Sequence, residues 1–357
     1  MEKTVVLAEY SRKRSKVTSL FKKYGLVLAF TAPFFICFIA FFLFPLFYGI
    51  IISLCNFKYS TPGVFKFNDF KWYEYLLVPS KKPLFYEAFW RSFLHTIIFA
   101  IIMVPVAVLF PLFLAILINK KPVGYKLFRC LVYLPSIIPL TASGTIFTML
   151  FMPKNQHGLL AELFPGFGPD LWFSENMFSF NIGNFAINVA WAWIPIFLMC
   201  FWGGWGSNFI ILTAGLQNIP KSLYEAANID GCSNWKKTLN VTIPGIKGQL
   251  VLCLFTTIIG YMGLYGQNYV LSSGGPTNPL LSSIPGGGRT STLIYFIQDI
   301  VANNANFKST LYGLGAAASL IFALIVGILT GIQMYATRDK KTGFEKSREF
   351  EQWKALE

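Results

Sequence analysis

Long stretches without a charged residue constrain this chain more than any other feature. A helix that crosses a membrane needs about 20 apolar residues, because lipid solvates neither a charge nor an unpaired peptide group. Only 13% of the residues are charged, whereas soluble domains carry roughly a quarter. The uncharged stretches cover residues 24–57, 92–119, 130–153, 176–220, 248–288 and 309–337. We therefore predict an all-α polytopic membrane protein with helices near 26–54, 93–118, 130–151, 186–212, 249–271 and 309–335.

The distribution of lysine and arginine favours six transmembrane helices. With six spans, 21 of the 30 basic residues fall on the side that carries both chain ends and the connections at 119–129 and 213–247. Basic residues accumulate on the cytoplasmic side of membrane proteins. We therefore expect both termini to be cytoplasmic. A seventh span would place the basic tail outside, which is why six is preferred.

The chain divides into three parts. We expect a cytoplasmic basic N-terminal segment at 1–25, a transmembrane domain at 26–336 and a cytoplasmic charged tail at 337–357. The net charge of +14 comes from residues at the ends of apolar segments, so membrane topology explains it without nucleic acid. The six cysteines form no Cys-x-x-Cys pair, and we expect neither a metal site nor a disulfide framework.

The predicted spans contain no aspartate or glutamate. Ion-driven carriers commonly place such groups inside the membrane, where a charge is costly and usually functional. The sequence also lacks the Gly-x-x-x-x-Gly-Lys-Ser/Thr loop that binds nucleotide phosphates. We therefore expect no catalytic residue and no cofactor bound by this chain. A polytopic membrane enzyme remains a remote alternative, because the spans show no acid, base or metal cluster.

A polar segment at 213–247 separates the fourth and fifth apolar stretches. Its residues follow the order Glu-Ala-Ala, three residues, Gly, nine residues, aliphatic, one residue, aliphatic, Pro; they are Glu225, Ala226, Ala227, Gly231, Val241, Ile243 and Pro244. This pattern resembles the Glu-Ala-Ala (EAA) loop of the membrane subunits of bacterial ATP-binding-cassette (ABC) importers. We predict a helix at 220–230 that ends at a left-handed Gly231, then a second helix capped by Ser233 or Asn234. The apolar docking surface of the first helix would consist of Leu223, Ala226, Ala227 and Ile229.

The resemblance extends over residues 26–336, toward the maltose and multiple-sugar branch of these permeases. Phe44-Pro45-Leu46-Phe47-Tyr48-Gly49 matches the first span of that branch, and Ala214-Gly215-Leu216-Gln217-Asn218-Ile219-Pro220 leads into the polar loop in the same way. The resemblance implies a type I ABC importer permease fold in the bacterial cytoplasmic membrane. It also implies three kinds of protein partner besides the lipid bilayer: a second homologous permease, two ATPase subunits that bind ATP and magnesium, and an extracellular or periplasmic solute-binding protein. Leu280–Arg289 looks like an insertion.

A candidate path for the solute follows from helical spacing and from the resemblance. Thr257, Tyr261, Tyr265 and Asn268 recur at intervals of three and four residues and form one polar-aromatic stripe. Trp202, Gly204 and Ser207 lie where the maltose permease contacts sugar. Aromatic faces and uncharged hydrogen-bonding groups suit a neutral sugar. We therefore predict half of the path of a sugar importer, with glycerol phosphate or a peptide as alternative solutes.

Overall fold

The computed structural model describes residues 25, 27, 29–57, 66–166, 169, 171–182, 185–276, 281, 284, 286–302 and 311–337. The predicted basic segment at 1–25, apart from Gly25, and the charged tail beyond residue 337 lie outside these residues. So do residues 280, 282, 283 and 285 of the predicted insertion between Leu280 and Arg289.

Within the described residues, four helices are long and apolar enough to cross a membrane, and two bent pairs bring the number to six. The first of the four is Ala29–Ser53, which includes η1 (Ile39–Leu43) and α2 (Phe44–Ser53). The second is α4 (Pro83–Asn119), and the third is Trp193–Gln217, made of α8 (Trp193–Gly204) and α9 (Gly206–Gln217). The last is α16 (Tyr312–Thr337). The first bent pair joins α5 (Tyr125–Tyr133) and η2 (Leu134–Ile137) to α6 (Leu140–Leu150). The second joins α11 (Asn234–Lys237), η4 (Thr238–Thr242) and α12 (Ile243–Gly245) to α13 (Lys247–Met262). The six-helix prediction is thereby confirmed.

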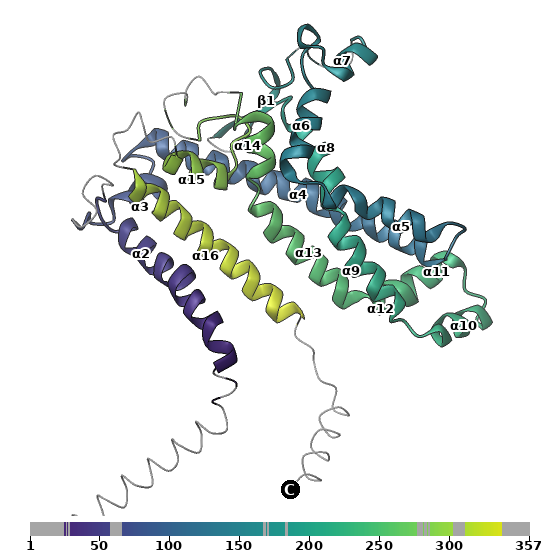
Figure 1. The fold of residues 1–357 in the computed structure, drawn as a ribbon. Helices are drawn as coiled ribbons and strands as arrows, with labels where there is room; N and C mark the ends of the chain where they lie inside the picture. The colour runs from purple at the N-terminus through teal and green to yellow at the C-terminus, as the bar shows by residue number, and fades with distance from the viewer. Residues whose placement is uncertain are drawn as a thin grey trace, which may run out of the picture.

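Short elements gather at the two ends of this bundle. α10 (Lys221–Ile229) lies with α11 and α12 at one end (Figure 1). At the other end lie α3 (Lys71–Leu77), η3 (Lys154–Gln156), α7 (Leu159–Leu163), β1 (Asn176–Ile182), β2 (Phe185–Ala190), α14 (Gly266–Ser272) and α15 (Leu293–Ala302). The strands pair antiparallel, with Ile182 opposite Phe185 and Phe178 opposite Val189.

Three predicted boundaries are wrong: the second span begins at Pro83, ten residues before the predicted start, the fourth begins later than predicted and the fifth ends earlier. The third span bends by 90° after Ile137, because Ile138 precedes Pro139 and takes an extended ψ of 128°, as residues before proline do. The fourth begins at Trp193, because residues 176–190 alternate polar and apolar side chains and form the hairpin. The fifth ends at Met262, where glycines 260, 263 and 266 weaken the helix.

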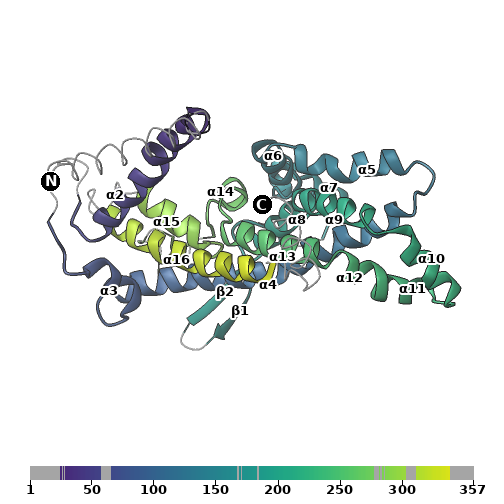
Figure 2. The ribbon, with the colours of Figure 1, turned by 90° about the horizontal axis from the view of Figure 1, so that it is seen from below.

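α4 is the central element of the packing. It contacts α9, α13, α15 and α3, and α16 lies between α2 and α13 (Figures 1 and 2). Three buried clusters follow α4 along its length, with Phe89, Phe99 and Leu112 as its members in the first, second and third. The third cluster joins α4 to α9 and to the start of α13, next to the polar segment at 213–247.

Candidate functional site

The end of α10 forms a left-handed corner at Gly231. The φ of Gly231 is +68°, which glycine adopts without steric cost. The Cys232 N–H donates to the Ala227 carbonyl at 3.0 Å, and the Gly231 N–H donates to the Asn228 carbonyl at 3.1 Å. This pair of bonds is the Schellman motif that ends many helices. The predicted helix end at Gly231 is therefore confirmed.

The second helix of the polar segment begins at Ser233. Its hydroxyl accepts a hydrogen bond from the Lys236 N–H at 3.4 Å, as expected of an N-cap. The helix continues through Pro244 to Gly245, and the chain turns by 71° into α13. Pro244 lies near the end of this continuous helix, where its missing N–H removes one hydrogen bond just before the bend.

Buried contacts tie the polar segment to the spanning helices. The hydroxyls of Tyr224 and Thr242 lie 3.0 Å apart and join α10 to η4. Ile246, at the bend, is fully buried among residues of α4, α9 and α13. A β-carbon on Gly245 would meet the Ile219 side chain at 2.9 Å, so the corner is closely packed. α10 is therefore connected to α9 and α13 through packed side chains.

The outer surface of the segment combines exposed apolar side chains with one carboxylate. Ile229 is 87% exposed, Trp235 71% and Leu223 50%. Glu225, Ala226, Gly231 and Pro244 are also exposed. Ala227 differs, since it is buried against the protein itself. The expected docking surface of four residues is therefore corrected to Leu223, Ala226 and Ile229.

A cavity of about 400 Å³ lies where the end of α8, α9, α13 and α14 meet. Five of the seven residues predicted for the solute path line it: Gly204, Ser207, Thr257, Tyr261 and Tyr265. The other lining residues are Leu140, Asn208, Thr256, Gly260, Gly263, Leu264, Gly266 and Gln267. None of these residues carries a charge. Because the sequence predicts the solute path at these positions, we call this space the translocation cavity.

Two predicted path residues lie outside the lining of the translocation cavity. Trp202 packs its ring on Phe147, with centroids 5.9 Å apart. Asn268 is fully buried, and its Nδ2 donates to the Thr290 carbonyl while its Oδ1 accepts from the Ser272 hydroxyl. Asn268 is turned away from the stripe because α13 ends before it and α14 takes a new direction. Through these hydrogen bonds, Asn268 connects α14 to the segment around Thr290.

Hydrogen bonds order the wall of the translocation cavity. The Asn208 amide donates to the Ala107 carbonyl at 2.9 Å and to the Thr257 hydroxyl at 2.8 Å, linking α9 to α4 and α13. Gly204 leaves room for the Tyr261 hydroxyl, since a β-carbon there would lie 2.6 Å from it. Sequence reasoning missed Asn208, although a buried amide inside an apolar span is itself a functional signal.

The interruption between α8 and α9 is held by a side chain from another element. The Ser136 hydroxyl of η2 donates to the Gly203 carbonyl at 2.8 Å and accepts from the Gly206 N–H at 3.0 Å. The Trp205 indole N–H donates to the Val132 carbonyl at 2.9 Å. These bonds satisfy peptide groups freed at the break and fix the position of Ser207 beside the cavity.

Residues 83–342 match the family described as the binding-protein-dependent transport system inner membrane component. This match covers more than half of the chain, which therefore belongs to that family.

Relatives within the family carry sugar transport names. The chain is 30% identical over 311 residues to the arabinooligosaccharides transport system permease protein AraP of Bacillus subtilis, covering 85% of this chain and 86% of that protein. It is 28% identical over 260 residues to the lactose transport system permease protein LacF of Rhizobium radiobacter, covering 71% and 77%. A chain of the crystal structure of a bacterial ABC transporter that imports alginate has the same fold, with a TM-score of 0.67 at 17% identity, covering 92% and 100%.

Proposed function

We propose that this chain is the permease subunit of an ATP-driven sugar importer of the bacterial cytoplasmic membrane, with an oligosaccharide as its solute. The observation that carries the sugar assignment is the translocation cavity. Its lining offers hydroxyl, amide and aromatic groups from Ser207, Thr257, Gln267 and Tyr261, and no charge. Such a wall matches the hydroxyls and C–H faces of a neutral sugar better than a phosphate or a charged peptide. The names of AraP and LacF support this substrate class.

The work for transport comes from partner ATPase subunits that bind ATP and magnesium. These subunits dock at the exposed corner of α10 and α11. There, Glu225 would contact a basic residue of the ATPase, and Leu223 and Ile229 would enter an apolar groove on it. A short amphipathic helix in a groove is a common docking mode. Because Ile246 is buried between α4, α9 and α13, closure of the ATPases would shift the helices that line the cavity.

The translocation cavity is one half of the path. Ser207, Thr256 and Gly260 are exposed on its open side, and this side would face a second, homologous permease. The end of the bundle with α3, α7 and the hairpin would receive a solute-binding protein. Both termini would then lie in the cytoplasm with α10.

Purification of the tagged chain from membranes of its own cells tests the assignment. We expect an ATPase and a second permease to co-purify, and sugar loaded on the binding protein to stimulate ATP hydrolysis in proteoliposomes. In Glu225→Lys, we expect the ATPase to keep its basal rate of ATP hydrolysis while sugar uptake is lost. The reason is that the lysine places a positive charge opposite the basic residue that Glu225 is proposed to contact on the ATPase. Purification without an ATPase would contradict the proposal, and so would normal uptake by Glu225→Lys.

A further inference from the structure

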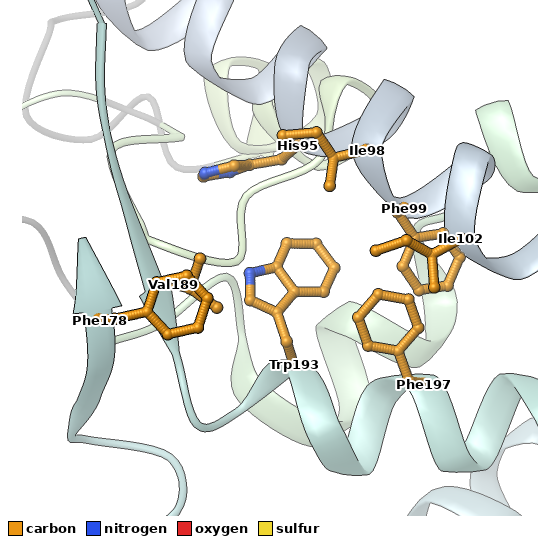
Figure 3. Close-up of a pocket in the computed structure, with 8 residues that line it drawn as sticks. All are labelled: His95, Ile98, Phe99, Ile102, Phe178, Val189, Trp193 and Phe197. Carbon is orange, nitrogen blue, oxygen red and sulfur yellow. The ribbon is translucent and has the colours of Figure 1, made fainter. Parts of the chain in front are cut away.

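The two ends of α4 border pockets of different chemistry. Toward its start, a pocket of about 250 Å³ is walled mostly by apolar side chains such as Phe99 and Trp193 (Figure 3), and no lysine or arginine lines it. At its other end, a pocket of about 170 Å³ lies between α4, α9 and the polar segment at 213–247. Two lysines, Lys120 and Lys237, line this second pocket, and no acidic residue does. We call it the basic pocket.

Among the described residues, the two lysines of the basic pocket have no counterion. Neither Lys120 nor Lys237 forms an ion pair with any side chain in the part of the chain that the structure describes. Glu225 directly follows the lining residue Tyr224 but does not itself line the pocket. Lys237 is half-buried, so water screens its charge less than that of a fully exposed lysine. An uncompensated positive charge at the wall of a cavity favours an anionic occupant.

The place of Lys237 in its helix also favours an anion. Lys237 lies in the first turn of the helix that runs from Asn234 to Gly245. The N-terminal end of a helix carries a partial positive charge, so it stabilises a neighbouring anion and disfavours a neighbouring cation. Lys120 differs, because it follows the last residue of α4, and a cation at a C-terminal end stabilises the helix. The local structure therefore explains Lys120, whereas an anion in the basic pocket would stabilise both Lys237 and the start of its helix.

Two amides supply the uncharged hydrogen-bond donors of the wall. The hydroxyls of Tyr224 and Thr242 lie 3.0 Å apart and pair with each other, and the Thr238 hydroxyl donates to the Asn234 carbonyl at 3.0 Å. The side-chain amides of Asn119 and Asn234 form no hydrogen bond with a described residue, so both can donate. Phosphate oxygens accept from amide N–H and ammonium groups. The volume of about 170 Å³ suits one phosphate group, since pockets for drug-sized ligands span about 300–1,000 Å³.

We propose that the basic pocket binds a phosphate group, with Lys120 and Lys237 as its cationic contacts and Asn119 and Asn234 as further donors. The phosphate belongs either to the head group of an anionic phospholipid or to a soluble phosphate ester of the cytoplasm. Basic pockets between spanning helices on the cytoplasmic side bind such head groups. The cytoplasmic location rests on the proposed function, whereas the binding itself rests on the pocket alone. Because α4 and the polar segment share the wall, a bound phosphate ties the corner at Gly231 to a spanning helix.

The experiment uses the full-length chain in nanodiscs and has two arms. In nanodiscs of phosphatidylcholine with a small share of phosphatidylglycerol, native mass spectrometry measures the phosphatidylglycerol that the chain retains. In nanodiscs of phosphatidylcholine alone, phosphorus NMR measures the binding of added inorganic phosphate through the broadening of its line. Lys237→Gln should weaken the observed binding about tenfold, the factor for one charge-assisted hydrogen bond. Lys236→Gln is the matched control, because Lys236 is the adjacent residue, is exposed and does not line the pocket.

Each result decides for or against the site. Binding that Lys237→Gln weakens and Lys236→Gln leaves at the wild-type level supports it, and the arm that shows the binding identifies a lipid or a soluble ester as the source. No binding in either arm overturns the proposal, and so does equal binding by the two variants. Each substitution removes one charge and breaks no ion pair with a described residue, so both variants should fold, and equal elution on size exclusion verifies this. Neither arm involves sugar or an ATPase, so its failure would leave the proposed function intact.

Discussion

The left-handed corner at Gly231 allows a prediction with a calculable size. A β-carbon on Gly231 would meet no atom within 4 Å, so Gly231→Ala causes no clash. Its cost is the backbone conformation alone, since φ is +68°. That conformation costs a non-glycine residue about 1–2 kcal/mol. The variant should therefore weaken the corner between α10 and α11 by this amount and leave the rest of the fold unchanged.

Hydrogen exchange of the full-length chain in nanodiscs measures this loss directly. The amides of residues 231 and 232 make the two bonds that close the corner. A loss of 1–2 kcal/mol should speed their exchange by a factor of about 5–30. In the assembled importer, the same variant should transport less sugar per ATP hydrolysed.

Gly248→Ala is the matched control. Gly248 lies in the first turn of α13, and a β-carbon there also meets no atom within 4 Å. Its φ is not in the left-handed region, so alanine should stabilise the helix by about 0.5–1 kcal/mol. Gly231→Pro should be more severe than Gly231→Ala, because proline also removes the N–H that donates to Asn228. Equal exchange at the corner in Gly231→Ala and Gly248→Ala would refute the reasoning.

Three further substitutions test the translocation cavity. Gly260→Leu places a side chain in the open space of the cavity and should abolish sugar uptake. Gly327→Leu on α16, where a β-carbon also meets open space, is the control and should transport normally. Similar uptake in the two variants would contradict the assignment of the cavity to the solute path. Tyr261→Ala should reduce uptake while the complex still assembles, and normal uptake would remove Tyr261 from the path. Asn208→Ala removes the bonds to α4 and α13 and should destabilise the chain by about 1–3 kcal/mol, seen as a lower unfolding temperature than that of Ser207→Ala.

The sequence predicted the spans more reliably than their ends. Uncharged windows reveal where lipid can surround a helix, and each of the six predicted helices overlaps an observed one, although α4 begins ten residues earlier and α13 ends nine residues earlier than predicted. The fourth was placed too early, although the alternating residues around Gly183 and Asn184 are typical of a hairpin. Hydrophobicity carries no information on direction, so it did not predict that the third span bends at the X-Pro step at Ile138.

The residues predicted for the solute path also divide into those that helical spacing placed correctly and those that depend on the packing of other elements. Tyr261 and Thr257 lie on one face of α13, as helical spacing predicts, and both line the cavity. Asn268 follows the same spacing, but α13 ends at Met262 and the stripe does not continue. Asn208 comes from another helix, and its link to Thr257 spans 49 positions of sequence. No periodicity within one segment can predict such a pairing.

The sequence by itself determined that this chain has membrane-spanning helices and a polar helix that ends at Gly231. Both are local properties, since the cost of a charge in lipid and the conformation of glycine depend on neighbouring residues alone. Only the tertiary structure decided which polar side chains line a common cavity and which, like Asn268, form hydrogen bonds to a connecting segment instead. These outcomes depend on how bent helices pack, and packing joins residues that the sequence separates.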